Sequence, residues 1–251
     1  MTVPQDKSES IPQHASESAP IDAPRSAPRV GVAVPAAGLG VRMGGLRKPF
    51  LELVGEPVLR HALAPFLDED RVVAVVVALA PDDAADPPAW ITDLDGRVRV
   101  VAGGQTRTES VRNAIVALPD DVDIIAVHDA ARPLVTRAMV SQCIDIAAEG
   151  RGAVAGCPAV DTLKRVDEQA LVLDTPSRIG MWQAHTPQVF PADLLRRAYE
   201  GAGSGTDDAA LVESVGGEVQ MVDGGSTNIK VTRPEDIAIA EAILAARKRD
   251  A

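Results

Sequence analysis

Short apolar runs alternate with helical patterns along most of this chain, and this alternation restricts the fold more than any other feature. The six runs expected to be strands are Val30–Val34, Val72–Ala78, Val98–Val101, Ile124–His128, Ala153–Cys157 and Glu218–Val222. The segments expected to be helices are Val58–Leu67, Arg107–Leu118, Thr136–Glu149, Pro191–Gly201, Thr206–Val215 and Pro234–Lys248. The continuous run Val72–Val77 is typical of a strand that is buried on both faces. The sequence therefore predicts an α/β fold, with a Rossmann-like, mostly parallel sheet and helices on both faces.

Length and composition indicate how the chain is divided. Its 251 residues are 46% hydrophobic, which is enough for one large domain with a sizeable core. Residues 1–28 are rich in Ser, Pro and Ala and contain few large apolar side chains, so we expect a disordered N-terminal extension. Residues 29–251 are expected to form a single domain.

The composition also argues against several classes of function. A net charge of −11 and an aromatic content of 2% disfavour binding to nucleic acid. No apolar stretch reaches the ~20 residues that a membrane-spanning helix needs, and the N-terminus lacks the apolar core of a secretory signal. Cys143 and Cys157 are too few for a disulfide scaffold and are expected to be packed, reduced thiols of a cytoplasmic protein.

The loop after the first strand, residues Pro35–Met43, contains two glycines and leads to two cations. Because Gly38 and Gly40 have no Cβ, backbone N–H groups can approach phosphate oxygens closely there. Arg42 and Lys48 can then neutralise the charge that develops when a phosphorus centre is attacked. The spacing matches neither a P-loop nor GxGxxG, and a tight turn without a phosphate is the alternative interpretation.

A second glycine-containing loop, Ala102–Val111, also follows a strand and begins a helix. Gly103 and Gly104 permit a close turn, and Ser110 and the first helical N–H groups can bind a base or a ribose. The alternative is a plain turn in which Thr106 caps the helix.

A third loop, His128–Pro133, places an acidic and a basic side chain after another strand. Asp129 can hold a metal-bound triphosphate or a ribose hydroxyl, and Arg132 offers a planar fork for phosphate. An ion pair between these two side chains across a turn is the alternative. In parallel sheets, ligands bind beyond the carboxyl ends of the strands, where these loops are expected to lie.

Two more segments carry candidate ligand-binding groups. In Trp182–Phe190, Thr186 precedes a proline, so we expect an extended backbone with the hydroxyl free to face a ligand. A buried structural turn is the alternative. In Gly224–Asp236, Lys230 lies between two apolar residues, which predicts a buried stem and an ammonium aimed at a phosphate rather than a solvated surface charge.

Residues 158–185, here called the arm, interrupt the alternation of strands and helices. Asp161–Val166 and Leu171–Thr175 are expected to pair as a β-hairpin. A hairpin that projects from the sheet is typical of a dimerisation arm, and an ordinary surface excursion is the alternative.

Together, and in this order, the five motifs resemble those of the 2-C-methyl-D-erythritol 4-phosphate cytidylyltransferase family of the non-mevalonate isoprenoid pathway. The resemblance extends from Arg29 to about Arg247. It implies that residues 29–251 are one nucleotidyltransferase domain that transfers the cytidylyl group of CTP to 2-C-methyl-D-erythritol 4-phosphate. The products would be 4-CDP-2-C-methyl-D-erythritol and pyrophosphate. The resemblance also implies Mg²⁺ as cofactor and a homodimer in which the arm of one subunit enters the pocket of the other.

The resemblance assigns roles to individual residues. The catalytic residues that it implies are Arg42, Lys48, Arg178 and Lys230. The CTP-binding residues that it implies are Pro35, Ala36, Ala37, Gly38, Gly40, Gly104, Gln105, Ser110, Asp129 and Ala130. The residues that it implies for the acceptor phosphate are Asp129, Arg132, Thr162, Arg178, Thr186, Thr206 and Lys230. Asp129 is also the implied Mg²⁺ ligand, directly or through water, and Thr162 and Arg178 are expected to act across the dimer interface.

Three other functions fit parts of this pattern. A cytidylyltransferase for another polyol phosphate, such as ribitol 5-phosphate, shares most of the motifs. A non-catalytic nucleotide-binding protein would bind CTP without releasing pyrophosphate, but it gives no reason for Arg42, Lys48 and Lys230 to occur together. A nicotinamide-dependent oxidoreductase would need GxGxxG in the first turn, which is absent.

Overall fold

A computed structural model of the chain describes residues 27–38, 47–201 and 205–250. Gly40 and Arg42 of the first loop lie outside these ranges, as do residues 1–26 of the expected N-terminal extension. Lys48 lies in a short 3-10 helix, η2 (Lys48–Phe50), and its side chain is outside the described part of the protein.

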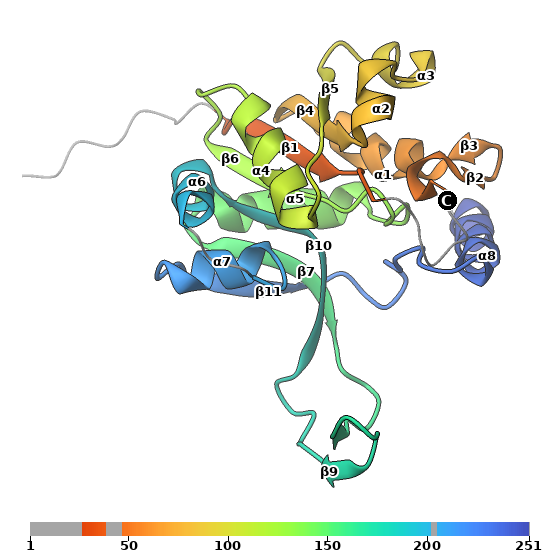
Figure 1. Cartoon of the computed structure of the whole chain (residues 1–251), viewed down its shortest axis with the longest axis vertical. Coiled ribbons are helices and arrows are strands. Elements are labelled where there is room, and N and C mark those ends of the chain that lie inside the picture. Colours follow the sequence, from red (N-terminus) through yellow and green to blue (C-terminus); the bar gives the residue numbers. More distant parts are fainter. Residues whose placement is uncertain (1–26, 39–46, 202–204, 251) are drawn as a thin grey trace, which may run out of the picture.

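Within these ranges, seven strands form one sheet in the order β11-β7-β10-β6-β1-β4-β5 (Figure 1). Their bounds are β1 Val30–Pro35, β4 Val72–Leu79, β5 Val98–Ala102, β6 Ile124–Val127, β7 Gly152–Pro158, β10 Trp182–Pro191 and β11 Val219–Asp223. All neighbours are parallel except β10, which runs antiparallel to both β6 and β7. The predicted mostly parallel α/β sheet is confirmed, and each of the six expected strands is present.

The sequence did not predict β10 as a strand, although it is the longest of the seven at ten residues. Pro187 lies in its middle and lacks the N–H that a central strand needs, which is why the segment was expected to be extended but was not counted among the strands. The strand accommodates this proline by a break in its pairing with β7 between Ala184 and Gln188. The Thr186–Pro187 peptide bond within this break is cis.

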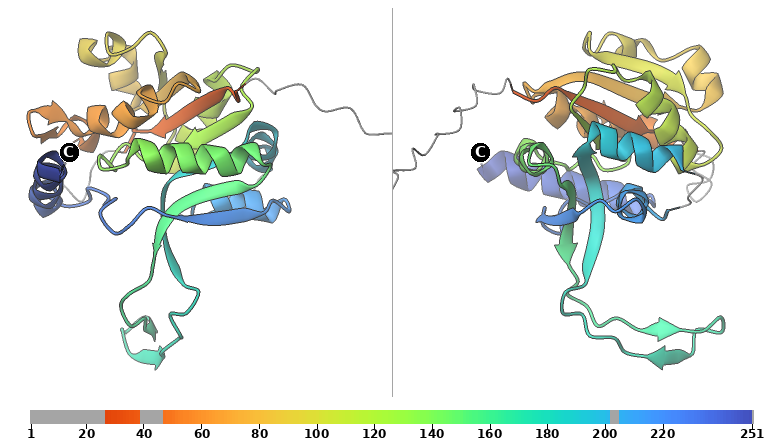
Figure 2. Two further views of the ribbon diagram at one scale, coloured as in Figure 1. Left: turned by 180° about the vertical axis from the view of Figure 1, so that it is seen from behind. Right: turned by 90° about the vertical axis from the view of Figure 1, so that its left-hand side faces the viewer.

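Helices cover both faces of the sheet, as predicted (Figure 2). The longer ones are α1 Val58–Leu67, α4 Arg107–Ala117, α5 Arg137–Ala148, α6 Ala192–Glu200, α7 Asp208–Ser214 and α8 Glu235–Asp250. The sequence did not predict the short elements β2 Glu52–Leu53, β3 Glu56–Pro57, α2 Pro81–Ala85 and α3 Ala89–Thr92. Successive side chains of β4 enter opposite layers: Val75 and Val77 pack with α1 and α5, and Ala74 and Val76 pack with α4.

The arm leaves the sheet between β7 and β10 and projects away from the body of the molecule (Figures 1 and 2). Its tip is a small antiparallel hairpin of β8 (Arg165–Val166) and β9 (Val172–Asp174), shorter than the two segments predicted. The carboxylate of Asp167 accepts the N–H groups of Gln169 and Leu171 and so closes the turn. Several large apolar side chains of the arm are exposed: Val160, Val166, Leu171, Val172, Leu173, Ile179, Met181 and Trp182.

Candidate functional site

A pocket of about 230 Å³ lies at the carboxyl ends of β1, β5 and β6. Loops after parallel strands converge at this edge of an α/β sheet, so the location is the one expected for a ligand site. The described residues that line the pocket are Pro35, Ala36, Ala37, Gly38, Pro49, Gly104, Gln105, Thr106, Arg107, Ser110, Asp129, Ala130, Ala131 and Lys230. The structure therefore brings residues from each of the first three loops together with Lys230.

The loop after β1 meets the loop after β5 at Gly103. A Cβ at Gly103 would lie 2.5 Å from the Cβ of Ala37, so only glycine allows the two loops to approach this closely. The N–H of Gly103 donates to the carbonyl of Leu79 at 2.7 Å, and the N–H of Ala36 donates to the carbonyl of Ala78 at 2.8 Å. Both loops are thereby fixed to the end of β4, and their backbones form one wall of the pocket.

The N-terminus of α4 forms a second wall. Thr106 caps the helix, because its hydroxyl accepts the N–H of Glu109 at 3.1 Å, as the alternative interpretation of this loop supposed. Ser110 is buried, and its hydroxyl accepts the N–H of Gly104 at 3.1 Å and donates to the carbonyl of Thr106 at 3.0 Å. The hydroxyl thus shapes the loop, and its contact with a base or ribose stays a prediction.

Asp129 lies at the centre of the site, in the loop after β6, and both of its carboxylate oxygens are paired. Oδ1 accepts Nε–H of Arg107 at 3.0 Å, and Oδ2 accepts Nζ–H of Lys230 at 2.7 Å. Burial opposes ionisation of this carboxyl, but the charges of Arg107 and Lys230 outweigh it and hold the pKa of Asp129 below its ordinary value. Asp129 is therefore an ionised carboxylate with a fixed orientation.

Lys230 reaches Asp129 from a segment that crosses the carboxyl edge of the sheet between β11 and α8 (Figure 1). The N–H of Val231 donates to the carbonyl of Ala131 at 2.7 Å, which fixes this segment to the loop after β6. The side chain of Lys230 is 40% exposed and its ammonium faces the pocket. The side chain is thus less buried than predicted; its ammonium binds Asp129, and its contact with a phosphate stays a prediction.

Arg107 was not recognised from the sequence as a site residue. Its guanidinium contacts two carboxylates, Asp129 through Nε and Asp208 through Nη1 and Nη2 at 3.2 and 2.8 Å. A cation on the first turn of a helix is disfavoured by the helix dipole, and this conflict is the one sequence signal that could have identified it. Its partner Asp208 is 101 residues away, so no local pattern connects them.

The prediction that the hydroxyl of Thr186 is free to face a ligand is wrong. Thr186 is buried; its Oγ1 accepts the N–H of Asp129 at 3.0 Å and lies 3.1 Å from Nδ1 of His128. Nε2 of His128 lies 3.1 Å from the carbonyl oxygen of Arg132, which can only accept, so Nε2 carries the proton and Nδ1 accepts from Thr186. Burial lowers the pKa of His128 to about 4, consistent with this neutral form. Thr186 therefore positions the backbone of Asp129.

Arg132 does not line the pocket. It is buried, and its Nη1 donates to the carbonyl of Asn228 at 2.7 Å, while its Nε lies 4.0 Å from Asp129 and has no hydrogen-bond partner. The expected planar fork is thus turned away from the pocket towards the backbone that precedes Lys230. The alternative of an Asp129–Arg132 pair is met only at the limit of an ion-pair distance.

Three residues expected on the acceptor side lie outside the pocket. Thr162 and Arg178 are exposed on the arm, where Nη1 of Arg178 donates to the carbonyl of Val160. Thr206 is exposed just before α7. The single chain does not bring these three side chains to Asp129 and Lys230.

Neither a clustered metal centre nor a membrane segment is found in residues 27–38, 47–201 and 205–250. No group of three or more His, Cys, Asp or Glu side chains there could hold a metal ion. No helix in these ranges is long and apolar enough to cross a bilayer.

Comparison with known proteins gives a consistent family assignment. Residues 30–246 match the sequence profile of the family described as IspD, 2-C-methyl-D-erythritol 4-phosphate cytidylyltransferase. The protein of that name from Dechloromonas aromatica is 42% identical over 227 residues, which cover 88% of this chain and 100% of that protein. The one from Solibacter usitatus is 40% identical over 237 residues, covering 86% of this chain and 96% of that protein.

Solved structures agree with the sequence comparison. The crystal structure of 4-diphosphocytidyl-2C-methyl-D-erythritol synthase from Anaerococcus prevotii superimposes with a TM-score of 0.77 at 28% identity, covering 87% of this chain and 97% of that one. The 2-C-methyl-D-erythritol 4-phosphate cytidylyltransferase from Thermus thermophilus superimposes with a TM-score of 0.71 at 33% identity, covering 87% and 98%. The chain therefore belongs to the 2-C-methyl-D-erythritol 4-phosphate cytidylyltransferase family and is a nucleotidyltransferase of isoprenoid precursor biosynthesis.

Proposed function

We propose that the pocket between the loops after β1, β5 and β6 is where this chain transfers the cytidylyl group of CTP to 2-C-methyl-D-erythritol 4-phosphate. A phosphate oxygen of the acceptor attacks the α-phosphorus of CTP in line. A new P–O bond forms between the acceptor oxygen and the α-phosphorus. The bond between the α-phosphorus and the oxygen that bridges it to the β-phosphorus breaks, and pyrophosphate leaves with the electron pair of that bond. The observation that carries this proposal is the ionised carboxylate of Asp129. Arg107 and Lys230 hold it in the pocket that the two glycine-containing loops also line.

The nucleotide side of the reaction is assigned to the backbone-rich walls of the pocket. Their close-packed loops and the N-terminus of α4 present N–H groups, which suits a triphosphate and a ribose. The residues that we assign to CTP are Pro35, Ala36, Ala37, Gly38, Gly40, Gly104, Gln105, Ser110, Asp129 and Ala130.

The cations are assigned to charge stabilisation. Arg42 and Lys48 follow the loop after β1 and would face the leaving pyrophosphate and the α-phosphate, while Lys230 and Arg178 would hold the incoming phosphate. The attacking phosphate is already ionised at neutral pH, so the reaction needs no general base. Positioning and preorganised positive charge then supply the rate enhancement.

The acceptor side is assigned to Asp129, Lys230 and the residues expected around the methylerythritol phosphate. Thr186 contributes indirectly, because its hydroxyl holds the N–H of Asp129. Thr162, Arg178 and Thr206 complete the set that we assign to this side, and Arg132 is left out of it because its guanidinium is buried against the carbonyl of Asn228.

Enzymes of this family are metal-dependent nucleotidyltransferases, and we assign Mg²⁺ to this chain. Mg²⁺ keeps several waters and is commonly held by one or two carboxylates together with substrate phosphates. Asp129, ionised and at the pocket, fits that pattern as a direct or water-mediated ligand. When bound, the ion would supply positive charge at the phosphate oxygens.

We further propose a homodimer in which the arm of one subunit carries Thr162 and Arg178 to the pocket of the other. The exposed apolar side chains of the arm support this arrangement, as does the absence of both residues from the lining of the single-chain pocket. Cys143 and Cys157 are buried free thiols, as expected in a reducing compartment, which supports a cytoplasmic location.

The proposed function is tested by measuring pyrophosphate release from CTP and Mg²⁺ with two acceptors side by side. Release with 2-C-methyl-D-erythritol 4-phosphate and not with ribitol 5-phosphate is the expected result. Release with ribitol 5-phosphate alone would keep the chemistry and replace the acceptor. Binding of CTP with no release in either reaction would instead support a nucleotide-binding protein.

A further inference from the structure

A buried carboxylate, Asp208, lies behind the pocket and is not part of it. Asp208 is the first residue of α7 and has no exposed surface. It accepts three hydrogen bonds, one from the hydroxyl of Tyr199 at 2.5 Å and two from the guanidinium of Arg107. A buried carboxylate is tolerated only when it is paired and hydrogen-bonded, so Asp208 and Arg107 form a unit whose geometry is fixed by both.

Arg107 connects this buried carboxylate to the pocket. Its guanidinium is planar, and the two nitrogens that bind Asp208 determine where the remaining Nε points. Nε donates to Oδ1 of Asp129, and the side chain of Arg107 lines the pocket while remaining 32% exposed. Burial opposes the charge of Arg107, but the two carboxylates outweigh it and raise its pKa, so the connection stays charged.

The position of Asp208 is itself fixed by β10. Asp207 caps α7 through the N–H of Ala210 at 2.9 Å, and Gln188 of β10 holds the same turn by accepting the N–H of Ala209 at 2.9 Å. The amide of Gln188 also donates to Asp207 at 3.0 Å. Hydrogen bonds thus connect four side chains in series: Tyr199, Asp208, Arg107 and Asp129. The buried end of this series is anchored to the sheet through Gln188 of β10.

We infer that Asp208 is a positioning residue for the cytidylyl transfer: through Arg107, and with Tyr199 behind it, it sets the orientation of the Asp129 carboxylate. The inference rests on the proposed function, since it assumes that Asp129 takes part in that reaction. Asp208 does not itself line the pocket, and its effect passes through the guanidinium of Arg107, which does. Without Asp208, Arg107 would keep its charge but lose the two hydrogen bonds that fix its plane.

The test is a double-mutant cycle of Asp208→Asn and Arg107→Gln, measured as kcat and KM for CTP. Asp208→Asn is expected to lower kcat about tenfold, because small displacements of a positioned group are costly, with a much smaller change in KM. In the Arg107→Gln background, Asp208→Asn is expected to have no further effect on kcat. Effects that multiply in the double variant, or a wild-type kcat in Asp208→Asn, would overturn the inference.

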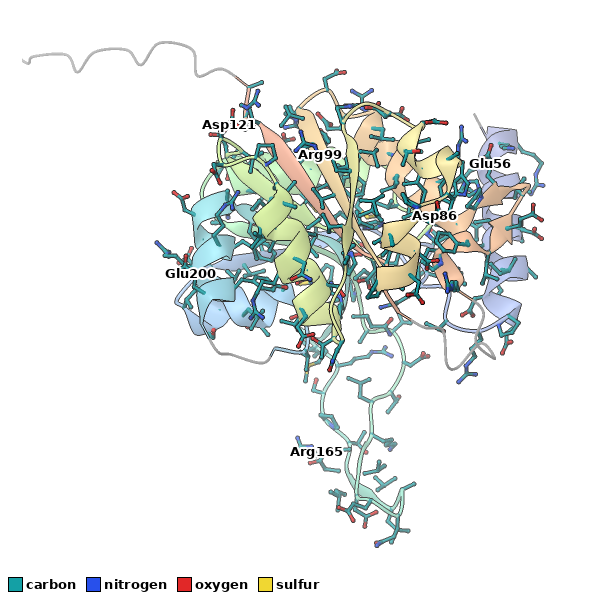
Figure 3. All side chains as sticks on the ribbon, turned by 45° about the horizontal axis from the view of Figure 1, so that its top comes forward. Glu56, Asp86, Arg99, Asp121, Arg165 and Glu200 are labelled. Carbon is teal, nitrogen blue, oxygen red and sulfur yellow. The ribbon has the colours of Figure 1, made fainter. Side chains whose placement is uncertain are left out.

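Two further variants separate positioning from folding. Tyr199→Phe keeps the ion pair between Asp208 and Arg107 and removes one hydrogen bond to Asp208, so it tests the inference if Asp208→Asn does not fold. A decrease in kcat smaller than that of Asp208→Asn is expected. An unchanged kcat would count against the positioning role of Asp208. Asp121→Asn is the matched control, because Asp121 pairs with Arg29 at 3.2 Å on the surface, at the other end of the sheet (Figure 3). It is expected to leave kcat unchanged.

A measurement without turnover distinguishes this inference from the proposed function. The Nε–H proton of Arg107, followed in a ¹⁵N NMR spectrum, is expected to exchange slowly with water in the wild type and faster in Asp208→Asn. If the wild type released no pyrophosphate but this proton behaved as expected, the link between Asp208 and Arg107 would stand and the proposed function would fall. If the wild type turned over and the exchange of this proton were unaffected by Asp208→Asn, the positioning inference alone would fail.

Discussion

The pocket and the arm differ in how their polar side chains are held. Around the pocket, Asp129 is fixed by Arg107, Lys230 and Thr186, which come from α4, the segment before α8 and β10. On the arm, the polar contacts are local: Lys164 donates to Thr175 at 2.8 Å, and Arg165 pairs with Asp174 at 3.6 Å with both side chains largely exposed (Figure 3). The body thus builds its site from distant segments, whereas the arm presents side chains that the single chain leaves uncovered.

This difference teaches where the missing part of the site should come from. Exposed apolar side chains concentrated on a projecting hairpin mark an interaction surface. A symmetric dimer would cover this surface and bring Thr162 and Arg178 of one subunit to the pocket of the other. The comparison therefore makes separate predictions for the body and for the arm.

The largest effect is expected in the pocket. Lys230→Met should lower kcat by about 10²–10³-fold, the range for loss of one preorganised group that stabilises transition-state charge. It also leaves Asp129 with Arg107 as its remaining partner at hydrogen-bond distance. Steady-state pyrophosphate release checks this, with Lys248→Met in the exposed last turn of α8 as the control of unchanged activity. Turnover within a factor of three of wild type would remove Lys230 from the reaction.

The free energy of unfolding should fall at low pH because of a buried histidine in the body, His128. Burial lowers the pKa of His128 to about 4, whereas an unfolded histidine titrates near its ordinary value of about 6.5. The unfolded state therefore binds the proton first, so this stabilisation is complete above pH 6.5 and is lost as the pH falls towards 4. The loss amounts to about 3 kcal/mol.

Urea unfolding of the wild type and of His128→Gln between pH 4 and 7 measures this contribution. The variant should be less stable at pH 7 and should show a shallower fall in the free energy of unfolding. Part of the slope should remain, because burial also lowers the pKa of His185 to about 4. If the free energy of unfolding fell equally with pH in the two proteins, His128 would titrate alike in the folded and unfolded states, and this prediction would be wrong.

Subunit mixing tests whether the arm acts in trans. Lys230→Met disables the pocket and Arg178→Ala disables the arm, so each homodimer should be nearly inactive. If the arm serves the partner's pocket, a heterodimer of the two variants contains one intact site and one site that lacks both groups. An equimolar mixture, refolded together, should regain about a quarter of the wild-type activity. A mixture no more active than its components would place Arg178 in the pocket of its own chain.

The smallest effect is expected on the arm surface. Leu173→Asp should weaken the dimer at least tenfold, because covering a leucine contributes about 1.5–3 kcal/mol and a carboxylate cannot replace it. Sedimentation at several concentrations checks this. Val116→Asp is the matched control, since Val116 is also highly exposed, at 75% against 62% for Leu173, but lies on α4 in the body. Equal dimer stability in both variants would separate the arm from dimerisation.

Much of the fold could be predicted from the sequence because it is encoded locally. The helix Val58–Leu67 has the predicted bounds, and each predicted parallel strand agrees to within one or two residues. β10 could not be predicted because Pro187 contradicts the local pattern of a central strand, and only its two neighbours in the sheet stabilise it there. The strand exists because tertiary pairing outweighs a local preference.

The candidate site was predictable where backbone and loop position define it, and not where side chains pair over long distances. Gly38, Gly104 and Asp129 lie two or three residues after the ends of β1, β5 and β6, so their place at the edge of the sheet follows from the topology. The contact of Thr186 with Asp129 and the contact of Arg107 with Asp208 depend on the register of distant segments. A single sequence contains no record of such pairs, and for this reason Arg107 was missed and the hydroxyl of Thr186 was given the wrong direction.

The interrupted ladder of β10 has a consequence for the site. From Trp182 to Ala184 the strand pairs with the end of β7 at the root of the arm, and from Gln188 onward it is clamped between β6 and β7. The unpaired residues 185–187 between these stretches divide the strand into an outer part at the root of the arm and an inner part within the sheet. Thr186 lies among these unpaired residues, where its hydroxyl accepts the N–H of Asp129 and its carbonyl accepts the side-chain amide of Asn228. The break in the ladder therefore frees one residue of the strand to join the root of the arm to the backbone of the site carboxylate.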